Sequence, residues 1–79
     1  MMTPPTVLGY VRAKPFRPFR IHTASGESYG VRHPELVKVG KTYVMIFTPA
    51  DEDLDVVDTF ETVSLMLSES ISHLETPVA

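Results

Sequence analysis

The stretch FRIHTASGESYGV, residues 19–31, decides the fold because its apolar residues match across a turn in only one pairing. A two-residue loop at its centre would set Ile21 opposite Gly30, which offers the isoleucine no apolar side chain. A three-residue loop that ends at a left-handed Gly26 sets Ile21 opposite Tyr29 instead. Because one face of a small sheet must be buried, we predict a β-hairpin in the second register.

This register sorts the side chains of the hairpin by polarity, since side chains alternate between the two faces of a strand. The apolar face carries Phe19, Ile21, Tyr29 and Val31. The opposite face carries Arg20, His22 and Ser28. We expect the first face to pack on the core.

The stretch KPFRPFR, residues 14–20, has a three-residue repeat, as an extended polyproline-type segment does. Such a segment is a typical ligand for proline-recognising domains, and its arginines and rings are also suited to stacking on bases. The simpler interpretation is a connector whose Phe16 and Phe19 enter the core while the arginines stay in solvent. We favour the connector, because a strand begins directly after it.

A short helix is predicted at the N-terminus. Thr3 is a suitable N-cap, and Pro4 fits the first turn, where its missing N–H costs nothing. An apolar stripe follows at Val7, Leu8 and Val11. Pro15 disfavours helical backbone at the residue before it, so we expect the helix to end near Ala13.

A second hairpin is predicted after a break at HPE, residues 33–35, which we expect to form one helical turn. Its strands cover residues 37–39 and 42–47, joined across Gly40-Lys41 by a type II′ turn. The run YVMIF, residues 43–47, is apolar on both faces, which predicts the central strand of the sheet. We expect Pro49 to end this strand.

The C-terminal third fits two structures. A helical stripe follows the capping-box pattern of Asp58 and Glu61, and periodicity alone favours a helix. The stripe consists of Phe60, Val63, Leu67, Ile71 and Leu74. However, residues 55–63 are rich in Val, Thr and Phe, and residues 71–74 have the composition of a short strand.

Several of these motifs occur together in one order: KPFRPFRIH at residues 14–22, the Gly26 turn, HPE at residues 33–35 and TVSLM at residues 62–66. In this combination the chain resembles a group of short uncharacterised bacterial proteins. That group has a Pro-Phe-x-Pro-Phe segment, a glycine turn, a His-Pro-Glu element and a terminal Ser-Leu-Leu…Ile-Glu strand. The resemblance spans nearly the whole chain and implies a small, strand-rich fold without an assigned activity.

The resemblance also implies a structure for the C-terminal third that differs from the helix. It implies a strand near residues 55–63, a helical turn near 64–70 and a strand at 71–75. Residues 67–70 are a local insertion relative to the group, and this insertion affects the alignment of the last strand.

Charge is strongly segregated along the chain, whose net charge is −3. Residues 1–41 hold all seven basic residues and two acids, whereas residues 42–79 hold eight acids and no Lys or Arg. This segregation has two possible meanings. In the first, the basic and acidic halves attract each other, within one chain or between two copies. In the second, the basic half binds nucleic acid. In the first case several basic residues should pair with the acids of residues 51–61; in the second they should converge on one exposed face. The candidate interaction surface consists of Arg12, Lys14, Arg17, Arg20 and Arg32.

Reactive and metal sites are weakly indicated. His22 and His33 lie on opposite faces of the predicted hairpin, and His73 alone adds too few ligands for zinc. The acids Asp51, Asp53 and Asp55 are spaced like the opening of a calcium loop, but the chain lacks the glycine and the final glutamate of such a loop. The sequence has no glycine-rich phosphate loop and no serine in a glycine elbow, so we expect no enzyme activity, no cofactor and no metal.

The chain thus predicts an α+β fold, mainly antiparallel β, forming a single domain over residues 1–79. A short N-terminal helix packs on a five- to six-stranded curled sheet or small barrel. The expected function is a non-catalytic protein-interaction module that forms a homodimer or binds a protein partner. The alternative is a small nucleic-acid-binding protein. Without cysteine, a signal-peptide pattern or an apolar run long enough for a membrane span, a cytoplasmic location without membrane association is expected.

Overall fold

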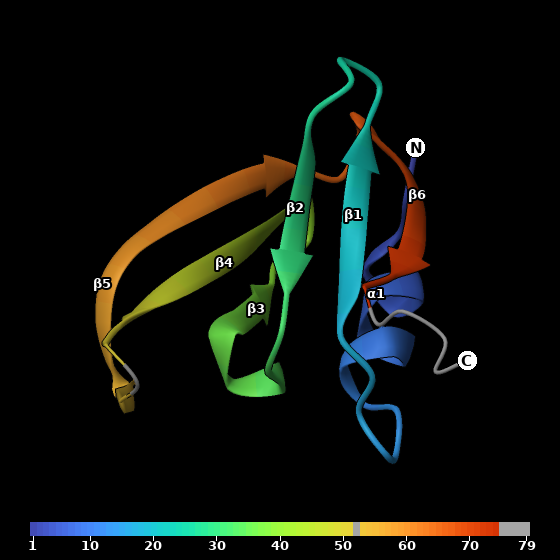
Figure 1. Cartoon of the computed structure of the whole chain (residues 1–79). Coiled ribbons are helices and arrows are strands. Elements are labelled where there is room, and N and C mark those ends of the chain that lie inside the picture. The colour runs from blue at the N-terminus through green and yellow to red at the C-terminus, as the bar shows by residue number, and fades with distance from the viewer. Residues whose placement is uncertain (52, 75–79) are drawn as a thin grey trace.

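In the described residues, six strands form two three-stranded antiparallel sheets, and one short α-helix packs with them (Figure 1). The computed structural model describes residues 1–51 and 53–74. Its elements are α1 (Pro4–Val11), β1 (Phe19–Thr23), β2 (Ser28–Val31), the 3₁₀ turn η1 (Pro34–Leu36), β3 (Val37–Val39), β4 (Tyr43–Ala50), β5 (Asp53–Ser64) and β6 (Ser68–His73). The first sheet has the order β2-β1-β6 and the second β3-β4-β5. The mainly antiparallel α+β class is confirmed. The single curled sheet or barrel is wrong, because the described strands form two separate sheets.

The β1–β2 hairpin has the predicted register. Ile21 pairs with Tyr29 and Phe19 pairs with Val31. Gly26 has a φ of 91°, so the left-handed position in the three-residue loop is confirmed. The connector before it also matches the prediction in its aromatic residues, since Phe19 is buried and Phe16 packs on the core.

The β3–β4 hairpin turns one residue later than predicted. The Gly40 N–H donates to the Tyr43 carbonyl at 2.7 Å, so the turn residues are Lys41 and Thr42. Gly40 lacks the positive φ that the first position of a type II′ turn requires, so that turn type is wrong. β4 is the central strand, as predicted, but it continues through Pro49 to Ala50. A shift in the pairing with β5 at Pro49 lets the strand accept a residue without an N–H.

The C-terminal third is strand, turn and strand, so the helix predicted from periodicity is wrong. β5 pairs with β4 along nearly its whole length, and β6 pairs with β1. The backbone hydrogen bonds of these long-range strand pairs stabilise the strands more than the apolar stripe would stabilise a helix. The strand-turn-strand order implied by the resemblance is confirmed. The turn covers only residues 65–67, however, in place of the expected helical turn near 64–70, and β6 begins at Ser68, earlier than expected. Glu75, at the end of the expected strand, lies outside the described residues.

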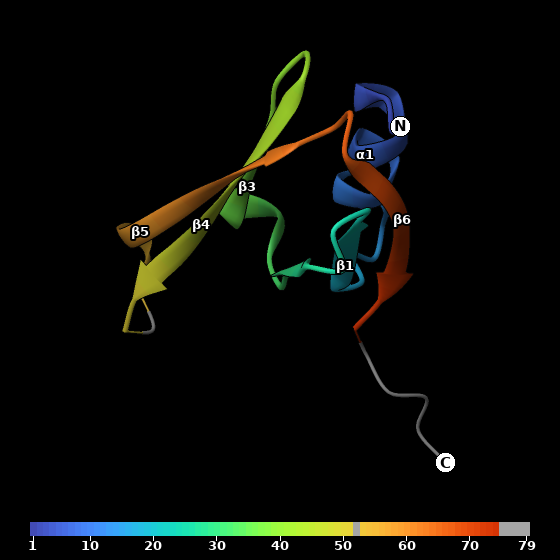
Figure 2. The same cartoon turned by 90° about the horizontal axis from the view of Figure 1, so that it is seen from above.

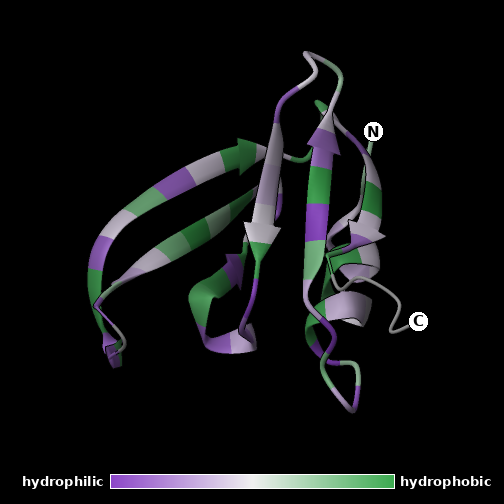
Figure 3. Ribbon diagram, in the orientation of Figure 1, coloured by the Kyte–Doolittle hydropathy of each residue, from purple (hydrophilic) through white to green (hydrophobic). Residues whose placement is uncertain are grey.

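The core lies where α1 and the two sheets meet. Buried residues from both sheets and from the N-terminal segment form one cluster: Met2, Val7, Phe19, Ile21, Val31, Val37, Val44, Ile46, Val63 and Leu65. α1 begins at Pro4 as predicted and ends at Val11, two residues before Ala13. Its Tyr10 ring lies 5.4 Å from the Phe19 ring. Hydrophobic and hydrophilic residues alternate along β1, as a strand with one buried face requires (Figure 3).

The β4–β5 hairpin, residues 43–64 and here called the arm, extends beyond this core. Seen from above, it projects away from β1, β6 and α1 (Figure 2). Among the described residues of the arm, the buried ones all lie at its base, namely Val44, Ile46 and Val63. The described residues of the outer part of the arm are therefore exposed or only partly buried.

Candidate interaction surface

The outer face of the arm is apolar, with Tyr43 and Phe60 exposed and Met45 and Phe47 partly exposed. Val44 and Ile46 point to the core, so the alternate residues of β4 point outward. The outward residues, with Phe60 of β5, form what we call the arm face: Tyr43, Met45, Phe47 and Phe60. Phe47 and Phe60 pair across the strands with ring centroids 6.1 Å apart. Phe60 is 56% exposed and Tyr43 is 42% exposed, so this aromatic row faces solvent.

β5 is an edge strand, and most of its side chains are exposed to solvent. From Asp53 to Thr62 all its residues are exposed except Leu54, which is partly buried. Val56 and Val57 are about half exposed near the tip. A long edge strand with exposed apolar side chains is a template for association with another chain. Its acids Asp53, Asp55 and Asp58 oppose pairing between identical edges, because like charges would meet.

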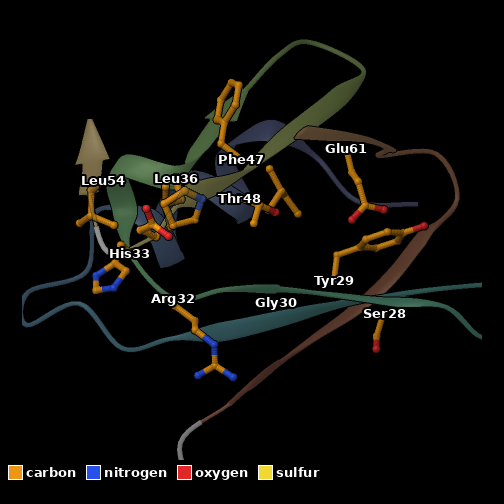
Figure 4. Close-up of a pocket in the computed structure, with 13 residues that line it drawn as sticks. Ser28, Tyr29, Gly30, Arg32, His33, Leu36, Phe47, Thr48, Leu54 and Glu61 are labelled. Carbon is orange, nitrogen blue, oxygen red and sulfur yellow. The ribbon is translucent and has the colours of Figure 1, made fainter. Parts of the chain in front are cut away.

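A cleft of about 590 Å³ separates the arm from β2. Its lining combines apolar side chains, including Leu36, Ile46 and Leu54, with the polar groups of Tyr29 and Glu61. Tyr29 and Glu61 lie at one end of the cleft, and Arg32 and His33 lie at the other (Figure 4). Figure 4 also shows the Phe47 ring directed away from the cleft, as its place on the arm face requires.

The Tyr29 end of the cleft is negatively charged. The Tyr29 hydroxyl donates to Glu27 Oε1 at 3.3 Å. Partial burial of the phenol, together with the negative charges of Glu27 and Glu61, raises the pKa of Tyr29 above its ordinary value of 10.0. The phenol is therefore neutral at physiological pH, and the charge at this end comes from the two carboxylates.

The five basic residues of the predicted surface do not line one cavity. Arg32 lines the cleft, whereas Arg17 lines a shallower hollow with Tyr10 and His73. Arg20 is partly buried and donates to Ser28 Oγ at 3.0 Å. Arg12 and Lys14 are exposed after α1. In the described part of the chain, no ion pair joins Arg12, Lys14, Arg20 or Arg32 to an acid of residues 51–61. The internal pairing expected from the charge segregation is therefore not found for these four residues.

The histidines are dispersed. His22 Nε2 lies 2.7 Å from Ser72 Oγ on the outward face of the first sheet. His73 Nδ1 lies 3.4 Å from the Pro18 carbonyl oxygen, and His33 lines the cleft. Among residues 1–51 and 53–74, no three His, Asp or Glu side chains are placed to hold one metal ion. In the same residues, no helix has the length and apolar character needed to cross a membrane.

Sequence reasoning missed the arm face. The run at residues 43–47 is apolar on both faces and predicts a central strand, but this composition does not tell whether one of the faces stays exposed. Periodicity assigns Phe60 to the apolar stripe of a helix. The signal available in the sequence is the match of Phe47 with Phe60, which appears once both segments are taken as paired strands.

Comparison of the chain with protein-family models, with curated proteins and with solved structures gives no match. The function must therefore be argued from the arm, the cleft and the charges described above.

Proposed function

We propose that this protein is a non-catalytic protein-interaction module that forms a homodimer through the arm face. The observation that carries the proposal is the exposed aromatic row on an unpartnered sheet face, in which Phe60 is 56% exposed. Exposed apolar patches of this kind mark interaction sites, because solvent contact of large apolar side chains is unfavourable.

A second copy is the occupant that the arm face suits best. In a two-fold dimer the same patch meets itself, so the apolar rows of two arms cover each other without any charge partner. The centres of homodimer interfaces are apolar and rich in aromatic residues and Met, which is the composition of Tyr43, Met45, Phe47 and Phe60. Sheets packed face to face lie about 10 Å apart, a separation that these side chains can fill.

Sedimentation velocity over a range of protein concentrations tests the proposal. We expect the wild-type chain to sediment as a dimer at micromolar concentration and Phe60→Ser to raise the dissociation constant about tenfold or more. Leu67→Ser is the matched control, because Leu67 is equally exposed, at 56%, but lies in the turn between β5 and β6. This control should leave the dissociation constant unchanged.

The result that would overturn the proposal is equally direct. A wild-type chain that remains monomeric up to about millimolar concentration excludes the homodimer. An equal effect of Phe60→Ser and Leu67→Ser would mean that general surface hydrophobicity, and not the arm face, drives the association.

Nucleic-acid binding is the second candidate, and the exposure of Arg12, Lys14, Arg17 and Arg32 favours it. Fluorescence anisotropy with short labelled duplex and single-stranded DNA tests it at low and moderate salt. Binding through phosphates would weaken steeply as salt rises, since counterions are released on binding. Anisotropy that stays flat at low salt would exclude this candidate.

A further inference from the structure

The free edge of β2 presents unpaired backbone groups to the cleft. The Thr23 N–H donates to the Glu27 carbonyl at 2.9 Å, so this pair bonds across the hairpin. Bonded pairs alternate along an antiparallel ladder, which makes Tyr29 the next β2 residue bonded to β1. Ser28 and Gly30 therefore direct their N–H and C=O groups away from β1. Among the described strands β2 has β1 as its sole neighbour, and both Ser28 and Gly30 line the cleft.

The opposite wall of the cleft is apolar where it faces this edge. Ile46 of the arm and Leu36 of η1 are largely buried, and Leu54 is turned into the cleft from the irregular part of β5. A chain added to β2 would place alternate side chains against this wall. At about 3.3 Å per residue, β2 has the length to pair with about four to five residues.

The negative charge at one end of the cleft favours a basic side chain at one position of the added chain. Glu61 projects from the arm on the same side as Ile46, with which it pairs. Glu27 accepts a hydrogen bond from the Tyr29 hydroxyl, so a second carboxylate lies next to this end of the cleft, just outside its lining. In a cleft with low-dielectric walls, this arrangement favours a cation and disfavours an acid.

We propose that the cleft binds an extended peptide segment of a partner protein by strand addition to β2. One apolar side chain of the segment packs on Leu36 and Ile46, and a Lys or Arg two residues away reaches Glu61. The unpaired groups of Ser28 and Gly30 supply the backbone hydrogen bonds, as in other cases of β-augmentation. This site lies on the inner side of the arm, whereas Tyr43, Met45 and Phe60 of the arm face lie outside the cleft lining, and Phe47 borders both surfaces. The cleft thus adds a second binding surface to the proposed homodimer.

Two synthetic peptides with blocked ends serve as probes: Thr-Val-Thr-Lys-Thr and Thr-Val-Thr-Glu-Thr. Amide NMR spectra of the labelled full chain are recorded with each. With the lysine peptide we expect shifts concentrated at Ser28, Gly30 and Glu61. The glutamate peptide should bind roughly tenfold more weakly, because its carboxylate meets those of the cleft.

Backbone pairing is tested at Ser28. Ser28→Pro removes the outward N–H and leaves the ladder with β1 intact, since Ser28 does not bond to β1. We expect it to weaken binding of the lysine peptide roughly fivefold, the equivalent of one hydrogen bond. Ser28→Ala is the matched control: it removes the same hydroxyl, including its bond from Arg20, but retains the N–H. This variant should bind as the wild type does.

The charge preference is tested at Glu61. Glu61→Lys should reverse the order of the two peptides, whereas Glu69→Lys, an exposed acid on β6 outside the cleft, should not. Equal binding of both peptides by the wild type, or no shift at Ser28 and Gly30, would overturn the proposal. So would cleft shifts that depend on protein concentration without any peptide, because the occupant would then be a second copy. Phe60→Ser should leave peptide binding intact, which separates this site from the homodimer.

Discussion

Ser68 is the residue on which the crossing between the two sheets depends. It is fully buried, and its hydroxyl donates to the Ser64 carbonyl at 2.7 Å. Its N–H donates to the Leu65 carbonyl at 3.2 Å. These two bonds close the turn through which the chain leaves β5 and returns to the first sheet as β6. A buried hydroxyl is costly unless it is hydrogen-bonded, so this bond stabilises serine at the buried position.

Ser68→Ala should therefore lower the free energy of unfolding by about 1–2 kcal/mol, because the Ser64 carbonyl loses its partner in a buried site. Urea denaturation followed by circular dichroism measures this change, with an unchanged slope against urea. Ser70→Ala, an exposed position on β6, is the control and should change stability little. Equal effects at the two positions would contradict the role of Ser68.

Tyr29 makes stability depend on alkaline pH. Its pKa is raised in the folded chain, so the phenol loses its proton more readily in the unfolded chain. The resulting stabilisation is complete below pH 10.0 and is lost as the pH rises through the raised pKa. In urea titrations above pH 10.0, the free energy of unfolding of Tyr29→Phe should therefore fall less steeply with pH than that of the wild type. Tyr43→Phe leaves this phenol in place and should retain the decline; identical curves for both variants would refute the assignment.

At the scale of elements, the hairpins were easier to predict than the C-terminal third. The β1–β2 register followed from residues 19–31 alone, because apolar matching and a glycine turn act over a short distance. β5 and β6 depend on partners far away in the chain, and periodicity carries no information about them. Phe60 illustrates the problem, since it fits a helical stripe in sequence but lies exposed on a strand in the structure.

The candidate site was predictable only in part. The sequence predicted an interaction surface from charge, at Arg12, Lys14, Arg17, Arg20 and Arg32, and this remains a prediction. The arm face and the cleft depend on how far the arm projects from the core. Burial of a residue such as Phe47 is decided by the neighbouring layer, which the local sequence does not specify.

Two glycines should respond to alanine with opposite signs, because their backbones differ. Gly26 has a φ of 91°, which strains an alanine, so Gly26→Ala should lower the free energy of unfolding by about 1 kcal/mol or more. Gly9 lies within α1 and a Cβ there meets open space, so Gly9→Ala should raise it by roughly 0.5–1 kcal/mol. Thermal unfolding of both variants measures the difference. The same sign for both would mean that the turn or the helix differs from the one described.

The whole molecule carries a net charge of −3, and the arm is its acidic part. The four described acids of β5 are Asp53, Asp55, Asp58 and Glu61. Two arms packed face to face bring these like charges near each other, while the contact itself is apolar. Salt screens the repulsion and does not weaken the apolar contact.

We therefore expect the dissociation constant of the homodimer to fall roughly two- to threefold between 50 and 500 mM NaCl. Sedimentation velocity at the two salt concentrations measures this change. The control is Asp58→Asn, which removes one repulsive charge and should make the response to salt smaller. A dimer that dissociates as salt rises would point to pairing of the basic half with the acidic half, and not to the arm face.

The bare outer part of the arm has a consequence for cooperativity. Residues 53–62 contribute almost nothing to the core, so the body of the molecule can remain folded while this segment opens. Binding on either face of the arm would then supply the layer that the segment lacks. We therefore expect the amides of residues 53–62 to exchange faster in the free chain than in a complex that covers the arm.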